Sequence, residues 1–188
     1  MAAPKKVLIF LLAYYPQVGG AEVAVKEITD RIAPEDIEFH MVTLRFDRSL
    51  PREERIGNVM VHRIGSGSSR LSKLLFQFSA TRAAARLHHQ HRFDATWAIM
   101  AHSAGVPAAL FKLFHPRVPM LLTLQEGDPP EYIERIMRSV WPLFSRAFTH
   151  ADAVQAISDF LGAWARRRRF TGPLEIIPNG VDTVRFAG

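Results

Sequence analysis

The chain has 188 residues, of which 48% are hydrophobic and 22% are charged, and its formal net charge is +6. This length and balance favour one globular domain that can bury its own hydrophobic core. The absence of cysteine excludes disulfide bonds and thiolate metal sites, and it permits a reducing compartment without requiring one.

The first predicted element is an apolar run that begins after Lys5-Lys6 and ends at Ala13. Its charge and apolarity imitate a signal peptide, but Tyr14-Tyr15-Pro16 stands where a small-residue cleavage site would be needed. The run is also too short to span a bilayer. A first strand that is buried in a parallel sheet is the favoured interpretation.

Along the rest of the chain, short apolar segments alternate with segments of helical periodicity. The predicted strands cover residues 6–13, 37–43, 59–64, 95–100, 120–124, 153–157 and 174–177. The predicted helices cover residues 21–32, 71–89, 104–114, 131–149 and 159–168. The strands scarcely alternate between apolar and polar residues, as burial on both faces requires. We therefore predict an α/β fold, a Rossmann-like three-layer sandwich around a mostly parallel sheet of about seven strands.

Three helix boundaries carry local signals. Asp128 precedes two prolines and stands three residues before Glu131, so it is predicted to be the N-cap of the helix over residues 131–149. Ser158 is predicted to cap the helix that begins at the next residue. Pro34 is expected to end the first helix.

A glycine pair follows the first predicted strand, in Gly19-Gly20-Ala21-Glu22, and opens a helix. Two glycines allow a ligand to approach the backbone closely, and the unpaired N–H groups of a helix N-terminus favour an anion. Ligands of open parallel sheets bind at the carboxyl ends of the strands. The alternative is an ordinary turn that needs positive φ. The spacing is not Gly-x-Gly-x-x-Gly, so the dinucleotide fingerprint is not met.

Three segments together resemble the N-terminal domain of family-4 glycosyltransferases, which have the GT-B fold. They are the glycine segment at 19–22 with the helix after it, the strand 152–158 that ends in Ser158 before a basic helix, and Ile177-Pro178-Asn179-Gly180-Val181-Asp182. Their order and spacing agree with the family and span almost the whole chain.

The resemblance implies that residues 1–180 form an acceptor-binding domain and that residues 181–188 begin the linker to a donor-binding half that this chain lacks. In the family, a sugar moves from a nucleotide-sugar to the acceptor in the cleft between the halves, with retention at the anomeric carbon and usually without a metal. Gly19 and Gly20 would face that cleft near the donor phosphates. The chain is expected to be inactive without a C-terminal half, which a partner subunit could supply. The sequence is compatible with a natural split subunit and with a truncated enzyme.

Five further residues are candidates for the site. His102 follows the strand 95–100 and would contact an acceptor or a phosphate, unless it only caps the next helix. Gln125 stands where many family members carry a histidine, but an amide cannot titrate. Glu126 and Asp128 could contact an acceptor hydroxyl or act as a base, although an N-cap would also explain Asp128. Asn179, in the junction motif, is a candidate substrate contact.

Basic residues concentrate between Arg55 and Phe93 and in the run 166–169, which is expected in the last turn of a helix. The helix over residues 71–89 also carries an apolar set at helical spacing, consisting of Leu71, Leu74, Leu75 and Phe78. Such a helix can lie on an anionic membrane, which would place a cytoplasmic protein on the inner membrane face. Packing of the apolar set against the sheet, with a solvated basic face, is the favoured alternative.

No metal is expected. His88, His89 and His91 could bind a transition metal, but the sequence shows no carboxylate or cysteine that completes a set, so a basic helix end is favoured.

Other functions remain open. A non-enzymatic module for anionic glycans or lipid headgroups is the main alternative, and a nucleotide-sugar epimerase shares the architecture. Nucleic-acid binding ranks last because no motif for it is present. Homo-oligomers are a further possibility, since a face that a second half would cover is left exposed.

Overall fold

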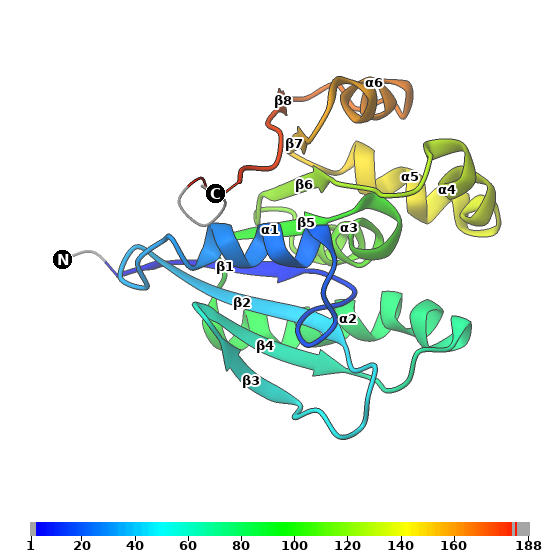
Figure 1. Ribbon diagram of the computed structural model, residues 1–188. Helices are drawn as coiled ribbons and strands as arrows, with labels where there is room; N and C mark the ends of the chain where they lie inside the picture. The colour runs from blue at the N-terminus through cyan, green and yellow to red at the C-terminus, as the bar shows by residue number, and fades with distance from the viewer. Residues whose placement is uncertain (1–2, 182, 184–188) are drawn as a thin grey trace.

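The chain is described by a computed structural model over residues 3–181 and 183, and residues 1–2, 182 and 184–188 lie outside the description. The strands are β1 (Lys5–Phe10), β2 (Ile37–Leu44), β3 (Glu53–Ile56), β4 (Val59–Ile64), β5 (Ala95–Ile99), β6 (Met120–Leu124), β7 (Ala153–Ala156) and β8 (Leu174–Ile176). Over the described residues they form one eight-stranded sheet in the order β3-β4-β2-β1-β5-β6-β7-β8 (Figure 1). Neighbouring strands are parallel, except that β3 runs antiparallel to β4.

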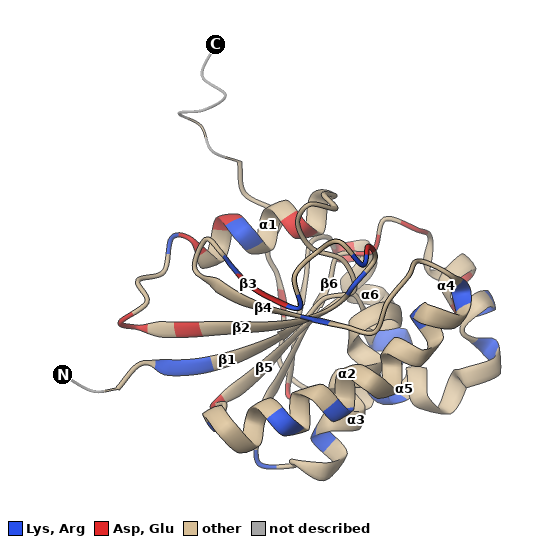
Figure 2. Cartoon of the chain, turned by 90° about the horizontal axis from the view of Figure 1, so that it is seen from below, with Lys and Arg blue, Asp and Glu red and all other residues tan. Residues whose placement is uncertain are grey.

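Helices cover both faces of this sheet. They are α1 (Gly20–Thr29), α2 (Arg70–His91), α3 (Val106–Phe114), α4 (Pro130–Ile136), α5 (Trp141–Thr149) and α6 (Asp159–Arg167), with a π-helical turn η1 (Ala101–Gly105) and a 3-10 turn η2 (Arg138–Val140). Helix α1 lies on one side of the strands, and α2, α3 and α5 lie on the other (Figure 2). This arrangement confirms the predicted three-layer α/β sandwich with a mostly parallel sheet.

The hydrophobic core is divided by the sheet into two clusters. The smaller one joins α1 to the sheet through residues such as Ile9, Val25 and Met41. The larger one lies under the helices of the opposite face and includes Phe111 and Trp164. The first apolar run is β1, whose residues Leu8 to Phe10 are fully buried, as predicted for an inner strand. No helix of the described part of the chain is long and apolar enough to cross a membrane.

The sequence analysis missed strand β3, which forms the antiparallel edge of the sheet. Its sequence, Glu-Glu-Arg-Ile, has no apolar pattern, and its side chains are half-buried or exposed. The turn to β4 is the pair Gly57-Asn58, and Gly57 has a φ of 56°, the positive value that the first position of a type II′ hairpin turn requires. This two-residue glycine turn was the signal that could have revealed the hairpin.

The predicted helix over residues 131–149 is wrong as a single element. The chain forms α4, η2 and α5, and Pro142 stands in the first turn of α5. Proline lacks an N–H group and its ring clashes with the preceding turn, so it begins a new helix here. Asp128 is not the N-cap, because α4 begins at Pro130 after Pro129 and has no side-chain cap. The predicted cap Ser158 is confirmed, since its Oγ accepts a hydrogen bond from the N–H of Leu161 at 3.4 Å.

The first helix also ends before the predicted boundary. Its last residue is Thr29 and its C-cap is Asp30, so Pro34 lies beyond the helix end. The carboxylate of Asp30 accepts from the N–H of Asn58, and the Asn58 amide donates to the carbonyls of Thr29 and Ile32. These bonds to the β3–β4 turn satisfy the carbonyls that the helix end leaves open.

Candidate functional site at the carboxyl edge of the sheet

The strand order reverses between β1 and β5. From β1 the chain passes through α1 to β2, on one side of β1, whereas β5 leads through η1 and α3 to β6 on the other side. Such switch points, at the carboxyl ends of parallel strands, are where doubly wound sheets bind ligands. Gly19 and Gly20 follow β1, His102 follows β5, and Gln125 and Glu126 follow β6, so the topology brings the predicted residues to one edge.

Glu126 is a buried ionisable group at this edge. Its side chain is 0% exposed, and Oε1 accepts a hydrogen bond from the backbone N–H of Ala101 at 2.5 Å. The Oε1 atom also lies 3.9 Å from Nδ1 of His102. Among the described residues, neither Glu126 Oε2 nor His102 Nδ1 has a hydrogen-bond partner. A buried carboxylate oxygen without a partner is unfavourable, and Glu126 Oε2 is able to accept one further hydrogen bond.

The backbone around His102 is strained. Met100, at the end of β5, has a φ of 70°, which is rare for a bulky residue. The following residues form the π-helical turn η1, and the carbonyl of Met100 accepts from the N–H groups of Ala104 and Gly105. This turn aims the N–H of Ala101 at Glu126. Strained residues and π-turns cluster at functional sites, so the geometry supports a site here.

Met100 and Ala101 were not predicted as site residues. Ser103, in the same turn, was also not predicted, and its buried Oγ has no hydrogen-bond partner among the described residues. The sequence offered one weak signal, because Gly105 and Pro107 interrupt the predicted helix over residues 104–114. The positive φ of Met100 had no signal, since methionine gives no local indication of it.

Gln125 joins the glycine loop to the same edge. It is buried, and its Nε2 lies 3.5 Å from the carbonyl oxygen of Gly20, which makes a long hydrogen bond at best. The two candidates after β6 therefore point to different neighbours, Gln125 to the loop after β1 and Glu126 to the turn after β5.

The glycine pair does not form the turn with positive φ that we considered. Gly19 has a φ of −134° and is the N-cap of α1, and Gly20 is its first residue. A Cβ on Gly20 would meet nothing within 4 Å, and one on Gly19 would meet only the flexible Glu22 side chain, at 2.7 Å. Nothing inside the described chain requires glycine at position 20. The space beside Gly20 is open, so the ligand role predicted for it stays a prediction.

Asp128 and Asn179 do not contact the pair of His102 and Glu126. Both are exposed, and within the described residues no hydrogen bond or ion pair joins either of them to His102 or Glu126. Asn179 lies three residues beyond the end of β8, at the same edge of the sheet. The predicted linker 181–188 lies mostly outside the described residues.

Helix α2 differs from the favoured prediction for its apolar set. The residues that pack on the sheet are Phe76, Ala80, Ala84 and Leu87. The predicted set is exposed instead, with Leu71 at 62%, Leu74 at 48%, and both Leu75 and Phe78 at 55%. Basic side chains accompany it, and basic residues are spread along the helical layer that contains α2 (Figure 2). The small alanines let the helix lie close to the sheet, which turns the larger leucines outward.

The basic run 166–169 lies at the end of α6, as predicted, with Arg168 as the C-cap. The guanidinium of Arg168 stacks over Trp141, with its carbon 3.8 Å from the ring centroid, and burial lowers its pKa. Arg166 donates to the carbonyls of Phe170 and Gly172. Both arginines therefore stabilise local structure.

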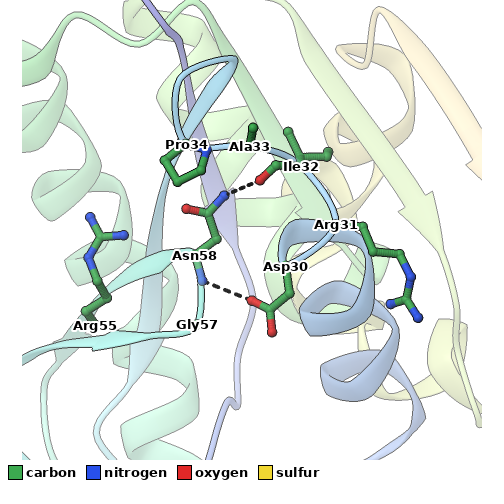
Figure 3. A pocket seen from close by; sticks show the side chains of 8 residues that line it. All are labelled: Asp30, Arg31, Ile32, Ala33, Pro34, Arg55, Gly57 and Asn58. Atoms are coloured by element: carbon green, nitrogen blue, oxygen red, sulfur yellow. Dashed lines mark hydrogen bonds between the residues drawn. The ribbon is translucent and has the colours of Figure 1, made fainter. Parts of the chain in front are cut away.

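A separate hollow of about 540 Å³ lies at the opposite edge of the sheet, where α1 ends beside the β3–β4 turn (Figure 3). There the carboxylate of Asp30 accepts from the backbone N–H of Asn58, and the Asn58 amide donates to the carbonyl of Ile32. Because these groups satisfy one another, the hollow is a structural junction, and the polar atoms without partners at the carboxyl edge mark the better candidate site.

The comparisons with known proteins identify the family and the fold. Residues 18–185 match the profile of Glycosyltransferase Family 4. A comparison with curated proteins found no match.

Solved structures with the same fold are GT-B glycosyltransferases. Sucrose-phosphate synthase from Thermosynechococcus elongatus has a TM-score of 0.73 at 14% identity, over 96% of this chain and 49% of that chain. HepE from Anabaena, solved in complex with UDP-glucose, has a TM-score of 0.64 at 17% identity, over 95% of this chain and 45% of that chain. MurG from Acinetobacter baumannii has a TM-score of 0.54 at 13% identity, over 95% of this chain and 47% of that chain.

At these identities the likeness shows the fold, and the chain spans about half the length of each neighbour. The profile match covers most of the chain, including the glycine loop and the strands that carry His102 and Glu126. The chain therefore belongs to glycosyltransferase family 4, as a glycosyltransferase-type N-terminal domain with the fold of one half of a GT-B enzyme.

Proposed function

We propose that this chain is the acceptor-binding domain of a retaining glycosyltransferase, which moves a sugar from a nucleotide-sugar to a glycan or a lipid-linked acceptor. In this proposal, residues 1–180 form the domain, residues 181–188 begin the linker, and a C-terminal half holds the donor. HepE, a structural neighbour, was solved with UDP-glucose, which supports a nucleotide-sugar as the donor. The chain alone is expected to be inactive.

The observation that carries the proposal is the pair of His102 and Glu126 at the switch point. A carboxylate with one oxygen tied to the Ala101 N–H and the other without a partner can accept a hydrogen bond from an acceptor hydroxyl. His102, whose side chain is 24% exposed, has its Nδ1 3.9 Å from Glu126 Oε1 and can orient the same hydroxyl. Gly19 and Gly20 would leave room for donor phosphates at the N-terminus of α1. In the same proposal, the substrate also contacts Gln125, Asp128 and Asn179.

Transfer to a glycan acceptor, and hydrolysis of the nucleotide-sugar, should be measured for the chain alone and with a candidate C-terminal half. We expect activity only with both halves. Full activity of the chain alone would contradict the division of labour and point to a site completed by a second copy. We also expect transfer to persist in EDTA at a temperature where the chain stays folded, since no metal takes part in the proposed chemistry.

Variants of the reconstituted enzyme test the pair itself. Glu126→Gln keeps an acceptor for the Ala101 N–H, so the fold should survive. If the carboxylate acts as a base, kcat/KM should fall by about 100-fold or more. His102→Ala should lower kcat/KM as well. Glu131→Gln, on the exposed first turn of α4, is the matched control and should retain activity. Equal activity of Glu126→Gln and the control would exclude this role for Glu126.

A second candidate function, peripheral binding to an anionic membrane, is favoured by α2. Four large apolar residues are exposed there beside the exposed Arg70, Lys73 and Arg82. An apolar stripe flanked by cations can enter the headgroup region while the cations contact anionic lipids. Such binding would bring a cytoplasmic enzyme to a lipid-linked acceptor.

Co-sedimentation with vesicles tests this candidate. The chain should bind vesicles that contain anionic lipid, and added salt should weaken the binding. Leu74→Ser combined with Phe78→Ser should reduce binding, whereas Phe160→Ser, at an equally exposed phenylalanine of α6, should not. Equal binding to neutral vesicles, or an equal loss in the Phe160 control, would contradict a membrane role for α2.

A further inference from the structure

A histidine cluster lies at the amino edge of the sheet, opposite the candidate site. It consists of Glu38 and His40 on β2, His62 on β4, His91 at the end of α2, and Glu53 on β3. The sequence analysis found no carboxylate to complete a metal set with the histidines of α2. In the folded chain Glu38 and His40 lie beside His91, so a carboxylate and a second histidine do stand next to the helix end.

Three of these residues present ligand atoms to one another. One ligand atom each from Glu38, His40 and His91 lies within 4.8 Å of the other two. Glu38 and His40 are two positions apart on a strand, so their side chains share the face on which α2 packs. The rings of His40 and His91 have centroids 4.3 Å apart. Two imidazoles and a carboxylate form a ligand set that suits zinc and related divalent ions.

Three polar contacts link this set to His62 and Glu53, and two neutral histidine rings do not carry enough protons to make all three of them hydrogen bonds. His62 Nδ1 lies 3.2 Å from Glu53 Oε1, His62 Nε2 lies 3.0 Å from His40 Nδ1, and His40 Nε2 lies 2.7 Å from Glu38 Oε1. Because carboxylates only accept, each of the three contacts needs one ring proton, and three protons on two rings make one of them a cation. Both rings are buried, where an extra charge is unfavourable. Two neutral rings supply two protons for three contacts.

A metal ion resolves this shortage. If Glu53 fixes the proton of His62 on Nδ1, then His62 Nε2 accepts from His40 Nδ1, and the lone pair of His40 Nε2 faces Glu38. A bound cation can replace the missing proton there, with Glu53 and His62 as the outer partners that orient a metal-bound histidine. Lys6 is the positive charge that competes with a bound cation, since its Nζ lies 3.6 Å from Glu38 Oε2. Its side chain is 31% exposed and has room to turn away.

We propose that Glu38, His40 and His91 bind one divalent transition-metal ion, with Zn²⁺ the favoured ion, and that this ion fastens the end of α2 to β2. The site lies at the edge opposite His102 and Glu126, so it is structural and independent of sugar transfer.

Metal binding should be measured on the whole chain after treatment with EDTA and dialysis. Zn²⁺ titrated by calorimetry and Co²⁺ followed by its visible absorption should each saturate at one equivalent. Zn²⁺ should raise the Tm of the wild type, and binding should weaken as the pH falls below 6, because protons compete for the imidazoles. No saturable binding at one equivalent would overturn the proposal.

Variants locate the ligands. His91→Asn and Glu38→Gln change partly exposed residues, so both should fold, which circular dichroism checks, and both should lose the Zn²⁺-dependent rise in Tm. Glu53→Ala removes only an outer partner and should weaken binding by about tenfold, whereas Lys6→Gln should tighten it. His89→Asn is the matched control, an exposed histidine of the same helix end outside the cluster. Unchanged binding in His91→Asn and Glu38→Gln, or equal loss in His89→Asn, would assign the metal elsewhere and overturn the site.

Discussion

At the scale of single residues, two glycines are constrained in different ways. Gly57 has a φ of +56°, and a Cβ there would lie 2.1 Å from Oδ1 of Asp30. Gly20 has no positive φ, and its Cβ would meet nothing within 4 Å. The first glycine is therefore required by the fold, and the second is free to serve a ligand.

The substitution Gly57→Ala should lower the free energy of unfolding by about 1–3 kcal/mol, because it adds backbone strain and a clash with Asp30. Gly20→Ala should leave that free energy within about 0.5 kcal/mol of the wild type, since an alanine fits the first turn of a helix. Urea unfolding measures both. A loss of stability in Gly20→Ala as large as that in Gly57→Ala would mean that Gly20 has a structural role.

At the scale of elements, the turn η1 is held by its close approach to α5. A Cβ on Gly105 would lie 2.9 Å from Cβ of Ala147 and 3.3 Å from Cδ1 of Leu122. Cβ atoms are fixed to the backbone, so one of the two elements would have to move. This packing, together with the positive φ of Met100, holds Ala101 where its N–H meets Glu126.

The substitution Gly105→Ala should therefore destabilise the chain by about 1–3 kcal/mol through overpacking. Adding Ala147→Gly removes the opposing Cβ and should recover part of the loss, although glycine in α5 itself costs about 1 kcal/mol. A double-mutant cycle in urea would measure the coupling between the two positions. Strict additivity would contradict a direct contact between η1 and α5.

At the scale of the whole molecule, buried and half-buried histidines make stability depend on pH. The pKa values of His40, His62, His88 and His150 all lie below the ordinary value of 6.5, chiefly because burial disfavours the charged ring. Below pH 6.5 the unfolded chain binds protons that the folded chain does not yet bind, so stability falls as the pH decreases. Well above pH 6.5 these rings are neutral in both states and have no effect.

We expect the urea midpoint to drop between pH 7.5 and pH 5.5, with EDTA present so that bound metal does not contribute. The pKa values of Asp30 and Asp94 lie below the ordinary 3.8, so these carboxylates stay ionised over this range. His150→Gln should reduce the slope of stability against pH. A flat profile in the wild type would show that the four rings are protonated as easily in the folded chain as in the unfolded one.

The sequence by itself determined the layers of this protein and its family. Apolar runs that alternate with helical periodicity located every strand except β3, because burial on both faces removes polar residues from a strand. The glycine segment and the junction motif are local signals, and they indicated the family before the fold was known. His102 and Glu126 were predicted for the same reason, since both directly follow predicted strands.

Only the tertiary structure decided how distant segments meet. Strand β3 pairs through its backbone and carries charged side chains, so no hydrophobic pattern could reveal it. The N–H of Ala101 reaches Glu126, 25 residues away, only because β5 and β6 are neighbours. The sequence of α2 has two sets of apolar residues at helical spacing, and the set that contains the small alanines is the one that packs against the sheet. Glu38, His40 and His91 are remote in sequence, and the contact between β2 and the end of α2 brings them together.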